Sequence, residues 1–178
     1  QSMTRRAYAT APFLFQMLFS LLAAQKELSL RHYDVKLLNF FLAKPSTRLA
    51  AEQQKEQKKK EATTATTATT TVALHYGVDG LQYTFPLESD TPSLAMLADF
   101  GTSDISPHTL HMPIELKHFT TLENTPPDFL LLGTKATQSA KADCFALGLC
   151  WLHLLTGRAP YEEVLASLAC PKELREGL

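Results

Sequence analysis

The chain has 178 residues, 45% of them hydrophobic and 20% charged, which is enough apolar material for a buried core and excludes a fibrous or wholly disordered chain. Its 17 Lys and Arg residues and 18 Asp and Glu residues give a net charge of -1, so no global basic surface is present for nucleic acid or an anionic membrane. Three cysteines without a C-x-x-C spacing indicate reduced thiols in a cytoplasmic protein, not disulfides or a zinc site.

The first predicted element is an apolar helix between Ala11 and Ala24. The stretch is too short to span a bilayer, and Gln16 and Ser20 share one of its faces because they lie four residues apart. The other side carries a broad apolar stripe, formed by Phe13, Leu14, Met17, Leu18, Leu21 and Leu22. We expect a mostly buried helix of a soluble protein, with a cleaved signal peptide as the alternative.

Residues 46–71 differ in composition from the rest of the chain. The charged run AAEQQKEQKKKEA is followed by TTATTATTT, which has too little apolar surface to offset the entropy lost on ordering. We expect a solvated insertion without a function of its own, and a regulatory or phosphorylatable tether is the alternative.

Short strands are predicted on both sides of this insertion. Asn39 to Leu42 has strand character, and residues 72–87 alternate as in a hairpin with its turn at Val78-Asp79-Gly80. Leu94 to Ala98 predicts a further strand, followed by a polar loop to about Asp128. The histidines of that loop lack the cysteines or paired carboxylates of a metal site, so we interpret them as loop residues.

A strongly apolar helix is predicted from Ser139 to Thr156, ended by Gly157 and Pro160. We expect three of its side chains, Trp151, Cys144 and Cys150, to lie in the core. One or two further helices are predicted after Tyr161.

Four polar side chains near two strand ends form a set suited to phosphoryl transfer. Asp34, Lys36 and Asn39 precede one strand, whereas Asp99 ends another and Gly101 lets the backbone turn away. Asn39 and Asp99 offer the oxygen ligands that Mg²⁺ takes together with substrate phosphates. The lysine can meet phosphate charge, and the remaining carboxylate can accept a hydroxyl proton.

The order of these residues resembles that of the eukaryotic protein kinases. The catalytic loop of that family, H-R-D-x-x-x-x-N, is similar to residues 32–39, and its D-F-G is similar to residues 99–101. Residues 125–128 resemble the A-P-E motif, and Asp143, Phe145 and Gly148 resemble the D-x-W-x-x-G pattern of a long buried helix. The resemblance covers about residues 11–170 and is the main reason for the functional prediction.

This resemblance implies an α+β fold, namely the mostly helical C-terminal lobe of a serine/threonine protein kinase with short β-hairpins. The lobe would cover residues 1–178, and residues 46–71 would be an insertion within it. The Gly-rich loop, the V-A-I-K lysine and its partner glutamate, which hold ATP in the family, have no counterpart before the apolar helix. We therefore expect the N-terminal β lobe to be absent from this chain and present in a longer one, and the isolated fragment to be inactive.

The resemblance also implies roles for individual residues. Asp34 would be the catalytic aspartate that accepts the proton of a protein serine or threonine hydroxyl, and Lys36 would contact the transferring γ-phosphate. Asn39 and Asp99 would bind Mg²⁺ and, with Lys36, ATP. Thr121 would bond near Asp34. A capping role for Asp34 and a turn role for Asn39 are the structural alternatives.

Other positions have structural roles or depart from the family. Asp143 would bond the backbone of the catalytic loop. Tyr33 stands where many kinases carry the arginine that pairs with an activation-loop phosphate, so we expect phosphorylation of that loop to change activity little. Pro126 and Asp128 replace Ala and Glu of A-P-E, and Phe145 replaces a tryptophan. The alternative functions are a pseudokinase or truncated kinase-like interaction module without turnover, and a helical adaptor unrelated to kinases.

Overall fold

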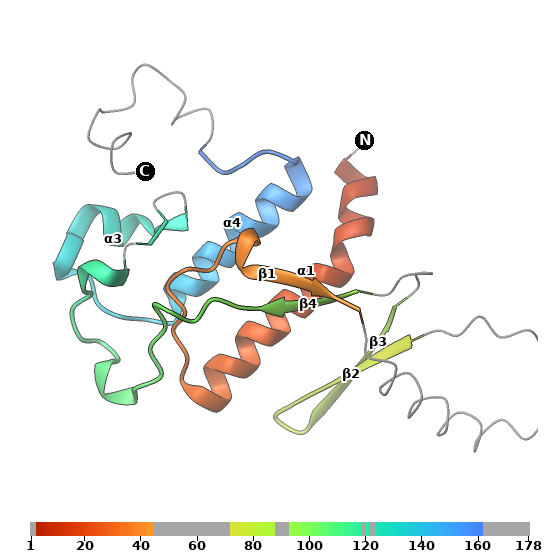
Figure 1. Cartoon of the computed structure of the whole chain (residues 1–178), viewed down its shortest axis with the longest axis horizontal. Coiled ribbons are helices and arrows are strands. Elements are labelled where there is room, and N and C mark those ends of the chain that lie inside the picture. Colours follow the sequence, from red (N-terminus) through yellow and green to blue (C-terminus); the bar gives the residue numbers. More distant parts are fainter. Residues whose placement is uncertain (1–2, 45–71, 88–92, 119, 122–123, 162–178) are drawn as a thin grey trace, which may run out of the picture. The chain divides into compact units, whose positions relative to one another are not determined.

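The computed structural model describes residues 3–44, 72–87, 93–118, 120–121 and 124–161 (Figure 1). The main elements in chain order are α1 (Met3–Leu28), β1 (Phe40–Ala43), β2 (Val72–Val78), β3 (Leu81–Leu87), β4 (Leu94–Leu97), α3 (Pro127–Leu132) and α4 (Lys141–Thr156). Short 3-10 turns are η1 (Leu37–Asn39), η2 (Pro107–Thr109), η3 (Leu116–His118) and η5 (Gly133–Lys135).

Helices and two small antiparallel sheets make this an α+β fold, which confirms the predicted class. The chain divides into two compact units, one formed by residues 1–40 with 97–178 and the other by residues 41–96. The predicted insertion at 46–71 and the predicted helices after Tyr161 lie outside the described residues. No described helix has the length and apolar content needed to cross a membrane.

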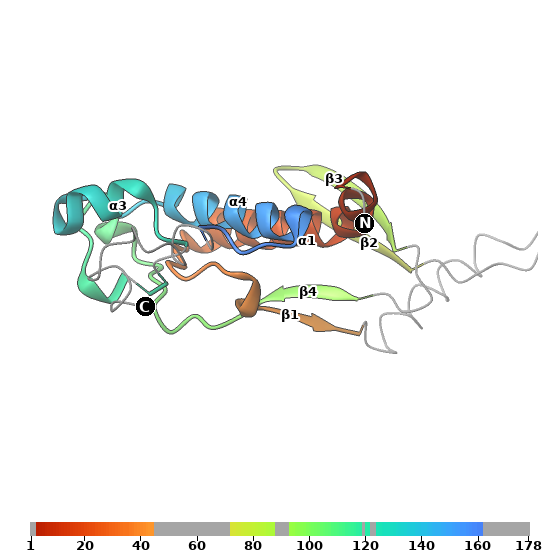
Figure 2. The same ribbon diagram turned by 90° about the horizontal axis from the view of Figure 1, so that it is seen from above.

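The first unit is built on α1 and α4, which lie side by side in both views (Figures 1 and 2). α1 buries Leu14, Met17 and Leu21, and α4 buries Leu147 and Cys150 among its apolar residues. Full burial of such a side chain stabilises the fold by about 1.5–3 kcal/mol. α1 begins at Met3, earlier than the predicted Ala11, and α4 ends at the predicted position.

The predicted faces of these two helices are partly wrong. Gln16 is only 4% exposed, whereas Leu18 and Leu22 of the expected apolar stripe are 47% and 39% exposed. Trp151 is 43% exposed and Cys144 is also exposed, so neither belongs to the core, although Cys150 does. The two helices pack together along one side, and a sequence that is apolar around most of a helix does not indicate which side that is.

The helix end at Gly157 follows the predicted stop signal. Gly157 has φ 74° and donates its N–H to the carbonyl of His153 at 2.7 Å. A left-handed φ costs glycine no Cβ clash, so glycine suits this position better than any other residue.

The second unit contains the predicted hairpin. β2 and β3 pair antiparallel from Val72 opposite Leu87 to Val78 opposite Leu81, and the turn between them is Asp79-Gly80. Both turn residues have positive φ, 51° and 75°, as a two-residue hairpin turn with the right-handed strand twist requires.

The second sheet pairs β1 with β4, and both strands differ from their predicted bounds by one residue. Asn39 belongs to η1, where its N–H bonds the carbonyl of Lys36 at 3.0 Å, and not to the strand. β4 ends at Leu97. These boundaries matter because Asn39, just before β1, and Ala98, just after β4, are joined by the backbone hydrogen bond described below with Asp99.

Candidate active site

The loop between α1 and η1 is fixed by one buried carboxylate. Asp143, in the first turn of α4 and 1% exposed, accepts hydrogen bonds from the backbone N–H of His32 at 2.7 Å and of Tyr33 at 2.8 Å. This is the contact that the kinase resemblance implied for Asp143. Burial raises the pKa of Asp143, and the two backbone hydrogen bonds reduce that rise without cancelling it. Tyr33 has the left-handed φ of 63°, a conformation that the surrounding bonds must hold.

The Asp34 carboxylate is the centre of the site and accepts four hydrogen bonds. Its Oδ1 accepts from the hydroxyls of Thr120 and Thr121, both at 2.8 Å. Its Oδ2 accepts from Asn39 Nδ2 at 2.9 Å and forms an ion pair with Lys36 Nζ at 2.9 Å. Burial raises the pKa of Asp34, but these four donors together outweigh burial and hold the pKa below its ordinary value. Asp34 is therefore an ionised, oriented carboxylate at neutral pH.

Three of the four predicted site residues are in direct contact. Asp34, Lys36 and Asn39 share the bonds given above, and Lys36 Nζ also donates to Thr121 Oγ1 at 3.1 Å. Asn39 Nδ2 donates a second time, to the carbonyl of Asp34 at 2.8 Å. Within the described part of the chain, Asn39 Oδ1 has no hydrogen-bond partner. The Asn39 side chain thus donates to Asp34 through its nitrogen, and its oxygen stays available to bind a cation or accept a hydrogen bond.

The fourth predicted residue, Asp99, lies in a segment bonded to the same loop. The N–H of Ala98 donates to the carbonyl of Asn39 at 2.9 Å, and the carbonyl of Ala98 accepts from His32 Nε2 at 3.0 Å. The rings of His32 and Phe100 lie 5.2 Å apart. Asp99 follows Ala98 directly, is exposed and has φ 61°. Among the described residues, no hydrogen bond or ion pair joins its carboxylate to the Asp34 group.

His32 connects the two segments through both nitrogens of its ring. Its Nδ1 accepts the N–H of Asp34 at 3.3 Å, so a neutral ring donates from Nε2 to Ala98. Its backbone carbonyl accepts from Thr102 Oγ1 at 3.1 Å. The first part of the kinase-like motif therefore has a positioning role between the Asp34 loop and the segment that carries Asp99.

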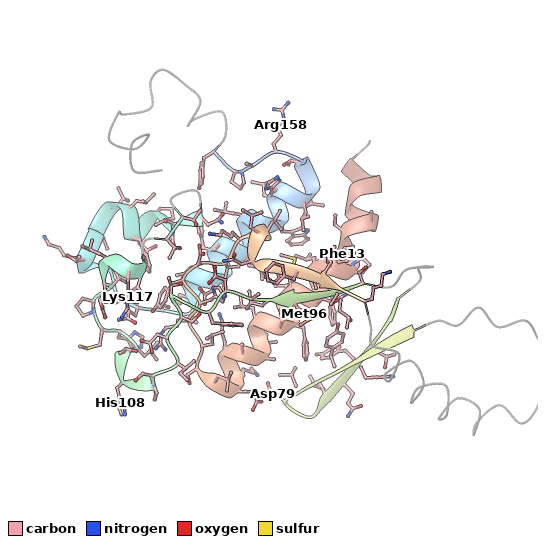
Figure 3. The ribbon with its side chains drawn as sticks, in the orientation of Figure 1. Phe13, Asp79, Met96, His108, Lys117 and Arg158 are labelled. Carbon is pink, nitrogen blue, oxygen red and sulfur yellow. The ribbon has the colours of Figure 1, made fainter. Side chains whose placement is uncertain are left out.

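The donor set fits a hard divalent cation in part. Asn39 Oδ1, on the Asp34 loop, and the exposed Asp99 carboxylate, on the segment bonded to it, are two oxygen groups that could bind the cation. Mg²⁺ needs only one or two protein ligands when phosphates and waters complete its shell. Across the described ranges, no cluster of three or more His, Cys, Asp or Glu side chains forms a metal site. His108 lies at the outer edge of its segment (Figure 3), and His118 is buried.

Tyr33, which stands where the kinase resemblance would place an arginine, contacts a histidine ring, an amide and the Arg31 guanidinium. Its ring stacks on His118 with centroids 4.1 Å apart, and its hydroxyl donates to Gln138 Oε1 at 3.0 Å. Burial raises the pKa of Tyr33 to about 12, and it lowers the pKa of His118. The Tyr33 side chain itself therefore offers no positive charge to a phosphate, and the neighbouring Arg31 is paired with Asp104.

Sequence reasoning missed Thr120 and Arg31. The Thr120 hydroxyl bonds both the Asp34 carboxylate and the carbonyl of Tyr33. In the sequence, its position next to Thr121 is the one feature that could have indicated a role in the site. Arg31, 2% exposed, pairs with Asp104 at 3.3 Å, and the two residues exchange backbone hydrogen bonds of 2.8 Å. This pair, of which Arg31 is buried, joins the loop to the chain beyond Asp99.

Comparison with family models, curated proteins and solved structures finds no match to this chain. The interpretation of the site therefore depends on the motifs and contacts of the chain itself.

Proposed function

We propose that this protein takes part in Mg²⁺-dependent transfer of the ATP γ-phosphate to a serine or threonine hydroxyl of a protein substrate, as a protein kinase does. The observation that carries the proposal is the Asp34 carboxylate, which Lys36, Asn39 and Thr121 hold in one orientation beside a segment that presents Asp99. A carboxylate, an ammonium group and two oxygen ligands are the inventory of phosphoryl transfer.

In this reaction the substrate hydroxyl oxygen forms a bond to the γ-phosphorus while the bond from that phosphorus to the bridging oxygen of ADP breaks. The hydroxyl proton passes to the Asp34 carboxylate, and Lys36 offsets the negative charge on the transferring group. Asn39 and Asp99 would hold Mg²⁺, which when bound offsets phosphate charge. Because the Asp34 pKa is below its ordinary value, Asp34 is a weak base whose main contribution is to orient the hydroxyl.

One observation favours the alternative, a kinase-like module without turnover. Both oxygens of Asp34 already accept two hydrogen bonds each, so a substrate hydroxyl must displace or share one of these donors. Thr120 is the most exposed of the donors on Oδ1, and its displacement would free a lone pair.

The experiment is phosphoryl transfer from labelled ATP by the full-length protein and by two matched variants. Asp34→Asn should lower the rate by about 100-fold or more, because it removes both the carboxylate that orients the hydroxyl and the acceptor of its proton, and a positioned acid-base group contributes about 10²–10⁴-fold. Glu27→Gln, which changes an exposed carboxylate of α1, should leave the rate unchanged. Equal rates for Asp34→Asn and the unsubstituted protein contradict the role of Asp34. No transfer by any form supports the module without turnover.

A further inference from the structure

A groove of about 340 Å³ opens from the candidate active site. One wall is Lys36, Leu37, Leu38 and Thr121, and the other is formed by residues of α4 and the chain just after it. Lys36 and Thr121 both touch the Asp34 carboxylate, at 2.9 and 2.8 Å. A polypeptide that presents a hydroxyl to Asp34 can therefore place the residues adjacent to that hydroxyl in this groove.

The groove is mainly apolar, and none of the described residues that line it is acidic. Its walls include Leu37, Leu38, Leu149, Ala159 and Pro160. Leu38 is 81% exposed, an apolar side chain left in water immediately beside a charged site. Lys36 and His153, the lining residues that can carry charge, are both basic, and the nearby Asp34 carboxylate is already paired with Lys36. An arginine or lysine entering the groove would therefore meet no carboxylate among its described lining residues.

We infer that this groove selects protein substrates with a large apolar side chain, of the leucine class, flanking the phosphate-accepting serine or threonine. The inference rests on the proposed function and adds the substrate class to it. An apolar side chain gains by leaving water for the leucine-lined walls, whereas a basic side chain is desolvated beside Lys36 with no carboxylate on the described part of the walls. Specificity then comes as much from rejection of basic residues as from attraction of apolar ones.

Binding of labelled peptides to the full chain tests this without any turnover. Pairs of peptides contain one serine and differ only in leucine or arginine at one flanking position, scanned along both sides, with fluorescence anisotropy as the readout. At one position at least, the leucine peptide should bind about ten-fold or more tighter than the arginine peptide. The ring signals of His153 in NMR spectra should shift on binding of the leucine peptide.

Two matched variants locate the effect. Leu38→Glu places a carboxylate on the groove wall and should reverse the preference towards arginine, and the 81% exposure of Leu38 means that folding does not depend on it. Leu131→Glu changes an equally exposed leucine of α3, 83% exposed and outside the groove, and should leave the preference unchanged. Equal binding of the two peptides, binding of neither, or identical behaviour of the two variants overturns the inference.

The outcome is separable from that of the proposed function. Preferential binding of the leucine peptide without phosphate transfer by the full-length protein would keep the groove assignment and reject the kinase activity. Phosphate transfer at equal efficiency to leucine and arginine peptides would keep the activity and reject the groove assignment.

Discussion

Replacing Asp143 with alanine removes the carboxylate that holds the Asp34 loop. Two backbone N–H groups, those of His32 and Tyr33, would lose their acceptors at 2.7 and 2.8 Å while staying buried. Tyr33 would also lose a bond that holds its left-handed φ of 63°. We expect both a lower free energy of unfolding and a less ordered Asp34 site.

The magnitude follows from the two orphaned donors. A buried donor left unsatisfied costs about 1–3 kcal/mol, so the pair costs about 2–6 kcal/mol. Burial raises the pKa of Asp143, which means that the folded state disfavours its charge, and removing that charge returns part of this cost. We expect a net loss of about 2–4 kcal/mol for Asp143→Ala, and a smaller loss for Asp143→Asn, which keeps one acceptor oxygen.

Urea unfolding followed by circular dichroism measures the loss, and amide hydrogen exchange reports the two backbone groups directly. Asp128→Ala is the control, because it removes an exposed carboxylate from the first turn of α3 and should cost no more than about 1 kcal/mol. The exchange of the His32 and Tyr33 amides should accelerate in Asp143→Ala alone. A loss equal to that of the control, with unchanged exchange, would refute the reasoning.

Three further predictions concern single side chains. The pKa of Asp34 is held below its ordinary value of 3.8, so Asp34 adds stability at neutral pH that is lost progressively as the pH falls from 3.8 through the lower folded value. A carboxyl NMR titration above 3.8 would contradict this. Tyr33→Phe removes the bond to Gln138 and should cost about 1–3 kcal/mol in urea unfolding, and an unchanged midpoint would argue against that bond. Burial raises the pKa of the Cys150 thiol to about 12, whereas Cys144 is exposed. Alkylation of the native protein followed by mass spectrometry should therefore modify Cys144 and spare Cys150, and equal labelling would show that Cys150 is accessible.

The elements predicted with most success were those with a local physical cause. Asp79-Gly80 supplies the two positive φ values of its hairpin turn, and Gly157 supplies the one at the end of α4. The contacts of Asp143 and Thr121 followed from the order of motifs and are present in the structure. Each of these depends on a residue type that few others can replace at that position.

The failures have a common cause in tertiary packing. Trp151 and Cys144 are exposed and Gln16 is buried, because α1 and α4 are apolar around most of their surfaces and the side that packs is chosen by the partner helix. Thr120 and the groove beside Lys36 arise only when residues 34–38 and 120–121 meet α4. No spacing within one segment signals a contact between segments so distant in sequence.

The central claim is that Asn39 and Asp99, from two separate stretches, serve one divalent cation beside Asp34. In the experiment, Fe²⁺ is added in place of Mg²⁺ to the full-length protein with ATP, and ascorbate and peroxide then generate radicals that cut the backbone nearest a bound Fe²⁺. Mass spectrometry should find cuts near both residue 39 and residue 99, and Asp99→Ala should lose both sets together. Cuts confined to one of the two stretches, or located elsewhere in the chain, would contradict the account.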